Sequence, residues 1–220
     1  MKRKNCTHAK SEPRKRQIIE AALACFTEKG FTDASIAEIC RRANASTGSV
    51  YHHFSSKEQL AAAVYLEGIA DYQAGFMEEL ERHKDARNGI MAIIRFYLKW
   101  VEQHPDWSRF LFQKRYAEFI GERKEELNRL NSAFFKRTSA WFKKHIEAGT
   151  IRRIPADLYP PLLMGPCMLY CQHYINGEVF TGIKEAAVLL GQSAWLAIAA
   201  QPVQPSGGNK RLKRKSLEND

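Results

Sequence analysis

The residues best suited to making polar contacts lie in one short stretch, STGSVYHHF at positions 46–54. It places three hydroxyl side chains, a phenol and two imidazoles on about two helical turns, and all of these groups form hydrogen bonds. Only Val50 and Phe54 are strongly apolar, and their spacing of four residues puts them on one helical face. We therefore expect a short helix that is held down by Val50 and Phe54 and whose outward face touches a flat, polar partner.

Other residue patterns that could carry chemistry are weaker. Cys167, Cys171 and His173 form C-x₃-C-x-H, but on a helix the two cysteines share a face while His173 points elsewhere. No further Cys or His lies nearby in sequence to complete a tetrahedral metal site, so buried structural cysteines are the simpler interpretation. The chain has no phosphate-binding glycine loop, no HExxH and no G-x-S-x-G. We expect no metal, no cofactor and no enzymatic activity.

The net charge of +10 is concentrated at the two ends of the chain. Residues 1–57 hold 11 Lys or Arg against 5 Asp or Glu, and residues 209–220 hold 5 against 2. The 151 residues between them are nearly neutral, with 18 basic and 17 acidic side chains. Basic ends on a neutral body indicate an anionic polymer as partner, either nucleic acid or a membrane surface. For the tail 209–220 alone, a role in solubility without a dedicated partner explains the charge equally well.

Composition and length favour a cytoplasmic globular protein. The chain has 220 residues, enough for one large domain or two modest ones. Its longest apolar stretch, at about 186–200, is too short to span a bilayer and is interrupted by polar and glycine residues. The N-terminus lacks the apolar run of a signal peptide, and five irregularly spaced cysteines argue against a disulfide scaffold.

Apolar spacing of three and four residues predicts helices throughout and no strands, so the expected fold class is all-α. A helix beginning at Pro13 ends before Gly30, and Ser35 with Glu38 forms a capping box for a second helix. Ser46 caps the third helix, and Ser55 with Glu58, or Ser56 directly, starts a fourth that reaches about residue 81. The later helices are expected at 88–103, 106–119, 122–148, 157–176 and 183–200.

Two short helices joined by a tight turn and packed on a longer one form a helix-turn-helix. Small side chains at Thr47, Gly48 and Ser49 allow the backbone of the second short helix to approach DNA. Tyr51 and His52 can donate to phosphates or touch a thymine methyl group, and Lys57 can pair with a phosphate. Ser35 and Ser46, at the helix starts, complete the predicted set of DNA-binding residues. Arg41, Arg42 and a basic arm from Lys2 to Arg16 are further candidates, although Arg41 and Arg42 are equally well explained as solvated surface charges.

The run TDASIAEICRRANASTGSVYHHFSSKEQL resembles the DNA-binding segment of the TetR (tetracycline-repressor) family of bacterial transcription regulators. The resemblance covers about residues 14–60. It rests on Ser35, Ile39–Cys40, Ala43–Ser46, Gly48, Tyr51, His53, Phe54, Lys57 and Leu60. Asn44, Ala45 and Cys40 depart from the family's glycine, valine and alanine, and Asn tolerates the left-handed backbone that a turn needs. The resemblance implies DNA contact by Tyr51 and Lys57 and base contacts from Thr47 to Ser49, while His53 is expected to pack within the motif.

The resemblance also implies a second, larger helical domain with a ligand pocket and two helices that dimerise. The expected organisation is a disordered basic arm (1–12), the helix-turn-helix domain (13–57), the ligand-binding and dimerisation domain (58–200) and a disordered basic tail (201–220). Most aromatic residues of the second domain are expected to form ordinary core, and a subset to line a pocket for an apolar molecule. The candidates are Phe96, Trp100, Trp107, Phe110, Tyr116, Phe134, Trp141 and Tyr170.

The segments 157–176 and 183–200 suit a pair of interface helices, because the second is apolar nearly all round and small residues permit close packing. A monomer that buries both helices internally is the alternative. The favoured function is a homodimeric repressor that leaves a palindromic operator when a small apolar effector binds. A DNA-organising protein of the same fold without an effector is the second hypothesis. An enzyme has no motif in its favour, and a membrane-surface protein would need an exposed amphipathic helix that the first helix does not provide.

Overall fold

The computed structural model describes residues 6–112, 121 and 123–200. Their only β pairing is an isolated antiparallel bridge between Ile151 and Ala199, so the all-α prediction is confirmed. The helices are α1 (Cys6–Asp33), α2 (Ile36–Arg42), α3 (Thr47–His53), α4 (Lys57–Arg82), α5 (Ala86–Gln103), α6 (Pro105–Phe112), α7 (Lys124–Glu147), η2 (Ala156–Leu158), α8 (Tyr159–Ile175) and α9 (Ile183–Ile198).

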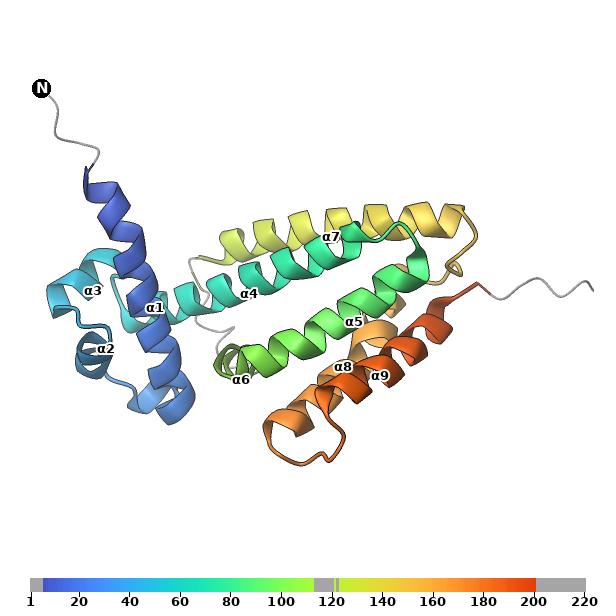
Figure 1. Ribbon diagram of the computed structural model, residues 1–220. Coiled ribbons are helices and arrows are strands. Elements are labelled where there is room, and N and C mark those ends of the chain that lie inside the picture. Colours follow the sequence, from blue (N-terminus) through green and yellow to red (C-terminus); the bar gives the residue numbers. More distant parts are fainter. Residues whose placement is uncertain (1–5, 113–120, 122, 201–220) are drawn as a thin grey trace, which may run out of the picture.

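The first three helices form a small unit at one end of the molecule, where α2 and α3 pack beside the longer α1 (Figure 1). The side chains of Ile18 and Phe26 on α1, Ile39 on α2 and Val50 on α3 meet in its core, and each is at most 1% exposed. Val50 is therefore turned inward, as its spacing predicted, and buried Phe54 closes the same core after the end of α3.

This core extends past residue 57, where the sequence placed the domain boundary. The first turns of α4, from Leu60 to Val64, belong to it, and so does Phe110 of α6, whose ring stacks on Phe26 with centroids 6.0 Å apart. Trp107 packs against both this core and the core of the larger unit. α4 and α6 are thus shared between the two parts of the molecule.

The larger unit is a bundle in which α5 packs on α4 on one side and on α8 and α9 on the other, while α7 runs along α4 (Figure 1). Fully buried Ile90, Ile93 and Ile94 of α5 form the centre of its core. Gly191 of α9 allows close contact, because a Cβ there would lie 2.9 Å from the sulfur of Met91. The bundle places long helices on all sides of an apolar interior.

Most later helix ends agree with the predictions to within two residues, and the larger departures lie at α1. α1 begins at Cys6 rather than Pro13, so residues 6–12 continue its backbone. Gly30 interrupts α1 with φ of +77°, as expected of a glycine stop, but helix resumes to Asp33. The predicted helix 106–119 is described only to Phe112, and the remainder of it lies outside the described residues, as do residues 1–5 and the tail 201–220.

Candidate nucleic-acid interface and internal cavity

The turn before α3 and its first residues are fixed by local hydrogen bonds. Asn44 takes the left-handed conformation with φ of +47°, which asparagine adopts more readily than most residues. The Ser46 hydroxyl then accepts a hydrogen bond from the Ser49 amide at 3.1 Å and caps α3. The start and orientation of α3 are therefore specified by residues 44–49.

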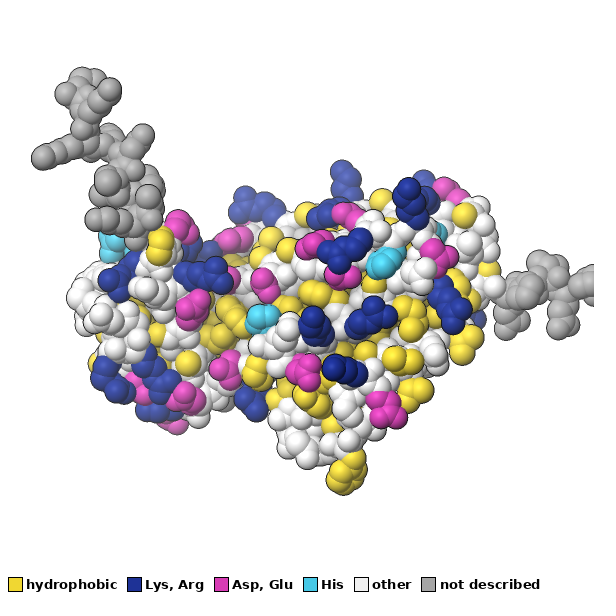
Figure 2. All heavy atoms as spheres, in the orientation of Figure 1, with side chains coloured by type: hydrophobic (Ala, Val, Ile, Leu, Met, Phe, Trp, Pro, Cys, Tyr) yellow, Lys and Arg dark blue, Asp and Glu magenta, His cyan; other side chains and the backbone are white. Residues whose placement is uncertain are grey.

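α3 presents small and uncharged polar groups to solvent. Thr47, Gly48, Tyr51 and His52 are exposed, and the side chain of Tyr51 stands half out of the surface. A Cβ built on Gly48 would meet nothing closer than the Ser46 hydroxyl at 4.0 Å, so packing within the chain does not require glycine there. The surface over α3 is accordingly mostly neither charged nor hydrophobic (Figure 2).

His53 and Ser35 have roles within the motif. His53 is only partly exposed, and burial together with neighbouring His52 lowers the pKa of its imidazole. The Ser35 hydroxyl accepts from the Glu38 amide at 3.2 Å and caps α2. The second half of the expected capping box is not formed, because the Glu38 carboxylate binds Lys29 and Arg42 instead. α4 is capped by Ser56 through the Gln59 amide, the second of the two predicted alternatives.

Arg42, a candidate for backbone contact, is engaged in an ion-pair cluster. Its guanidinium binds Glu28 at 2.5 and 2.7 Å and Glu38 at 3.1 Å. Lys29 donates to the same Glu38 at 2.6 Å. The hydrogen bond from Lys29 lowers the pKa of the Glu38 carboxyl, and that from Arg42 lowers the pKa of Glu28. Basic and acidic side chains accordingly lie side by side over α2 and the end of α1 (Figure 2).

Two cations proposed for DNA contact are bonded to the motif's own backbone. Arg14 of the basic arm donates from Nη1 to the carbonyl oxygens of Ala43 and Asn44, at 3.2 and 3.0 Å. Lys57 donates to the carbonyl oxygens of Thr32 and Ala34, and its Nζ lies 4.4 Å from the centre of the Phe31 ring. The sequence showed these residues as surface charges and gave no signal for either backbone contact.

The larger unit contains a cavity of about 830 Å³ between α4, α5, α7 and α8. Aromatic rings make up much of its wall, and ring pairs such as Phe76–Phe134 and Phe142–Tyr159 meet at 5.2 and 4.9 Å between centroids. Of the seven predicted pocket aromatics that the structure describes, only Phe134 lines this cavity. The lining residues that the prediction missed include Tyr72, Phe76, Phe135, Phe142 and Tyr159.

The other predicted pocket residues face different neighbours. Phe110 is fully buried in the N-terminal core, and the Trp107 ring fills the space beside Gly68 of α4. Trp100 donates from its indole to Asp71 at 2.9 Å, and the Trp141 ring packs against the tilted His145 ring with centroids 4.2 Å apart. Phe96 packs against Tyr72 and Gly75 of α4, and Tyr170 donates to the carbonyl of Thr181. Tyr116 lies outside the described residues.

The cysteine pattern forms no metal site in the described chain, where no three His, Cys, Asp or Glu side chains gather around a common point. Cys167 and Cys171 are fully buried, and burial raises the pKa of both thiols to about 12. His173 points away and lies 2.5 Å from Glu178. None of the described helices has the length and apolar character needed to cross a bilayer.

The N-terminal part of the chain is similar in sequence to known transcription regulators. Residues 18–64 match the model of the bacterial regulatory proteins of the tetR family. The HTH-type transcriptional regulator UidR of Escherichia coli is 39% identical over 71 residues, which are 32% of this chain and only 36% of UidR. The matched segment thus spans about a third of that relative's length.

Solved structures match nearly the whole described fold. A TetR family transcription regulator from Marinobacter aquaeolei aligns with a TM-score of 0.73 at 19% identity, over 88% of this chain and all of the other. FadR from Bacillus subtilis, solved in complex with stearoyl-CoA, aligns with a TM-score of 0.70 at 14% identity, over 83% of this chain and 98% of FadR. At these identities the likeness shows the fold. Residues 18–64 therefore carry the DNA-binding segment of the tetR family of bacterial regulatory proteins, and the described chain has the fold of regulators of that family.

Proposed function

We propose that this protein is a cytoplasmic transcription regulator, without catalytic activity, that places α3 in the major groove of its operator. The observation that carries the proposal is the combination of an inward anchor at Val50 with an exposed polar face at Thr47, Gly48, Tyr51 and His52. The small residues Thr47 and Gly48 at the start of α3 permit close approach of the helix to DNA. The larger side chains of Tyr51 and His52 reach base edges and phosphates.

Ser35, Ser46 and Lys57, also predicted to contact DNA, form hydrogen bonds within the protein. Each of them can still donate a hydrogen bond to DNA. Ser35 and Ser46 accept hydrogen bonds as helix caps, which leaves each hydroxyl proton available to donate to a phosphate. The Lys57 ammonium has three N–H groups and gives two of them to backbone carbonyls. The remaining donor is the one that can reach a phosphate.

The active form in this proposal is a homodimer assembled through α8 and α9. These helices and the loop between them expose large apolar side chains in the single chain: Met168, Leu169, Phe180, Val188, Leu189 and Leu196. The small residues Cys167, Ala187, Gly191 and Ala194 instead face this chain's own core. Large apolar side chains exposed together on two neighbouring helices are typical of an interaction surface. Two copies related by a twofold axis would bind half-sites about 34–36 Å apart in a palindrome.

The proposed regulation is release from the operator when a small, largely apolar molecule enters the cavity. α4 supports this link, because it lines the cavity with Tyr72 and Phe76 while its first residue, Lys57, holds the α1–α2 loop. The fold similarity to FadR with its bound stearoyl-CoA also favours an apolar effector. An effector that binds the released arrangement more tightly than the DNA-bound one shifts the population toward release.

Genome-wide recovery of DNA bound to the protein in its native host tests this function. One or a few palindromic peaks, next to genes whose transcripts rise when the protein's gene is deleted, are expected of a local repressor. Hundreds of peaks without a transcriptional response would favour a DNA-organising protein of the same fold. Absence of peaks above background would contradict both.

A further inference from the structure

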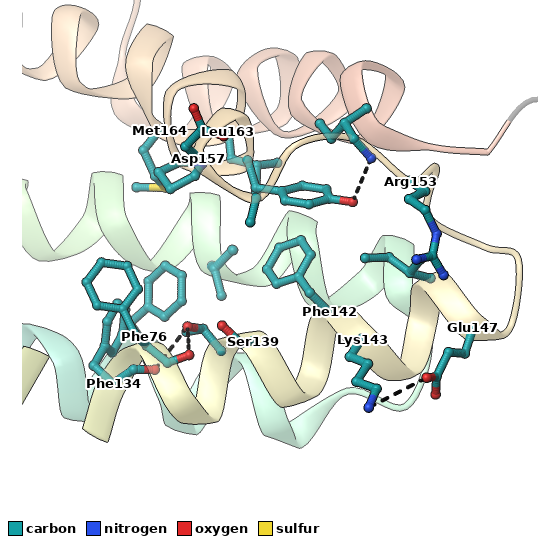
Figure 3. Close-up of a pocket in the computed structure, with 18 of the residues that line it drawn as sticks. Phe76, Phe134, Ser139, Phe142, Lys143, Glu147, Arg153, Asp157, Leu163 and Met164 are labelled. Carbon is teal, nitrogen blue, oxygen red and sulfur yellow. Dashed lines mark hydrogen bonds and ion pairs between the residues drawn. The ribbon is translucent and has the colours of Figure 1, made fainter. Parts of the chain in front are cut away.

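The cavity has an apolar end. Phe76 of α4 and Phe134 of α7 lie together there, with Leu163 and Met164 of α8 across the space (Figure 3). The hydroxyl of Thr138 donates back to the carbonyls of Phe134 and Phe135, so it offers no free donor at this end. A ligand group held here would gain from burial of apolar surface and from contact with aromatic rings.

The opposite end of the cavity carries charge at its opening. Arg153, Lys143 and Glu147 gather there, and the Arg153 side chain points toward the other two (Figure 3). Lys143 and Glu147 neutralise each other as an ion pair at 3.8 Å. Arg153 has no ion pair or side-chain hydrogen bond with any described residue, which leaves one positive charge unmatched at this end.

The remaining carboxylate of the lining does not balance that charge. Asp157 lies beside Leu163 and Met164 on the other side of the cavity, and it is not paired with Arg153 (Figure 3). Ser139 lies between the aromatic end and the charged end, and within the described chain its hydroxyl has no hydrogen-bond partner. Apart from the exposed carboxylate of Asp157, the lining therefore changes from apolar side chains, past the Ser139 hydroxyl, to the Arg153 cation at the opening.

We propose that the cavity binds an elongated, mainly apolar molecule with a negatively charged group at one end. The anionic group pairs with Arg153 at the opening, where it stays partly hydrated, and the apolar body extends between Phe76 and Phe134. The volume of about 830 Å³ lies in the range of cavities that enclose a small-molecule ligand. This inference rests on the proposed function, because it names the chemical class of the proposed effector.

Calorimetric titration of the purified full-length chain with four probes of equal length tests the inference without DNA. Decanoate and decyl phosphate carry an anionic group, decan-1-ol is neutral and decylammonium is cationic, and all are used below their aggregation concentrations. We expect both anions, or the one whose geometry suits Arg153, to bind at least threefold more tightly than the alcohol. Decylammonium is expected to bind more weakly than the alcohol.

The variant Arg153→Met, with Arg152→Met as its matched control, tests whether Arg153 supplies the positive charge that binds the anionic group. Both residues are exposed neighbours, but only Arg153 lines the cavity. Because the ion pair is partly solvated, Arg153→Met should weaken anion binding by about threefold to tenfold and leave decan-1-ol binding unchanged. Arg152→Met should leave all four affinities within error of the wild type.

A cavity-filling variant, Ser139→Trp, shows whether the probes bind in this space. It should abolish binding of every probe while the helical signal and melting temperature stay near those of the wild type. Equal or tighter binding of decylammonium, equal effects of the two arginine variants, or undiminished binding to folded Ser139→Trp would each overturn the inference. All of these experiments measure binding of the probes in the absence of DNA. Their failure would therefore overturn the ligand class without contradicting the proposed DNA-binding function.

Discussion

Lys57 Nζ lies 2.8 Å from the carbonyl oxygen of Ala34, and the first residue of α4 is thereby tied to the loop between α1 and α2. The same ammonium donates to Thr32 at 3.2 Å and sits over the Phe31 ring. α4 continues from this point to the cavity, so one helix joins the DNA-binding motif to the proposed effector site.

Replacing Lys57 with Met is expected to lower the free energy of unfolding by about 1–2 kcal/mol. Two hydrogen bonds from a charged donor are lost, and their contribution is reduced by partial exposure. Urea denaturation measures this effect. Lys84→Met, which removes an exposed lysine from the segment before α5, is the matched control and should be neutral.

The salt dependence of DNA binding then separates the two roles of Lys57. If its third N–H contacts a phosphate, the slope of log K against log salt falls by about one in Lys57→Met. A stability loss with an unchanged slope would restrict Lys57 to its structural role.

Arg14→Met is expected to destabilise the turn before α3, because the carbonyls of Ala43 and Asn44 lose their common donor. The predicted loss is about 1 kcal/mol in unfolding free energy. Amide hydrogen exchange should show faster opening of residues 43–49. Arg16→Met provides the comparison, since Arg16 pairs with Glu20 on the exposed side of α1 and makes no backbone hydrogen bond to the described turn. Equal exchange in the two variants would contradict the assigned role of Arg14.

Acid should weaken the cluster around Glu38. Its pKa in the folded chain lies below the ordinary value of 4.5, chiefly because of the hydrogen bond from Lys29. A carboxyl with a lowered folded-state pKa contributes stability above its unfolded pKa, and this contribution disappears as pH falls through the folded value. The melting temperature of the wild type should therefore drop more between about pH 5 and pH 3 than that of Glu38→Gln. Parallel curves would show that the cluster does not contribute.

Leu196→Glu is expected to disrupt the proposed dimer. Leu196 is 75% exposed in the single chain, and in the dimer the new carboxylate would be buried without a partner. Analytical ultracentrifugation should show dimers for the wild type and monomers for the variant. Ala133→Glu introduces the same charge on an exposed position of α7 and should stay dimeric. A monomeric wild type would contradict the assignment of α8 and α9.

The helix-turn-helix could be predicted from the sequence because the residues that determine it are close together along the chain. The caps at Ser35 and Ser46 and the turn at Asn44 are set within a few residues and occur where the pattern predicted them, and Ser56 is one of the two caps predicted for α4. The lining of the cavity could not be predicted in this way. Whether an aromatic residue lines it depends on how far each helix is rotated and on what it packs against.

Phe134 and Phe110 illustrate the difference. Both lie on helices within the same aromatic-rich stretch, yet one lines the cavity and the other fills the N-terminal core. Arg14 and Lys57 likewise donate to backbone carbonyls that lie 23 to 30 positions away in the sequence. No local sequence pattern encodes such contacts.

Selection of genomic fragments by the purified protein, compared between the wild type and Gly48→Leu, tests whether α3 recognises an operator. A side chain at position 48 has open space within the chain, so the variant should keep the stability of the wild type. We expect the wild type to enrich a palindromic sequence at physiological salt and Gly48→Leu not to do so. Failure of the wild type to enrich any sequence, or equal enrichment by a folded Gly48→Leu, would contradict operator recognition by α3.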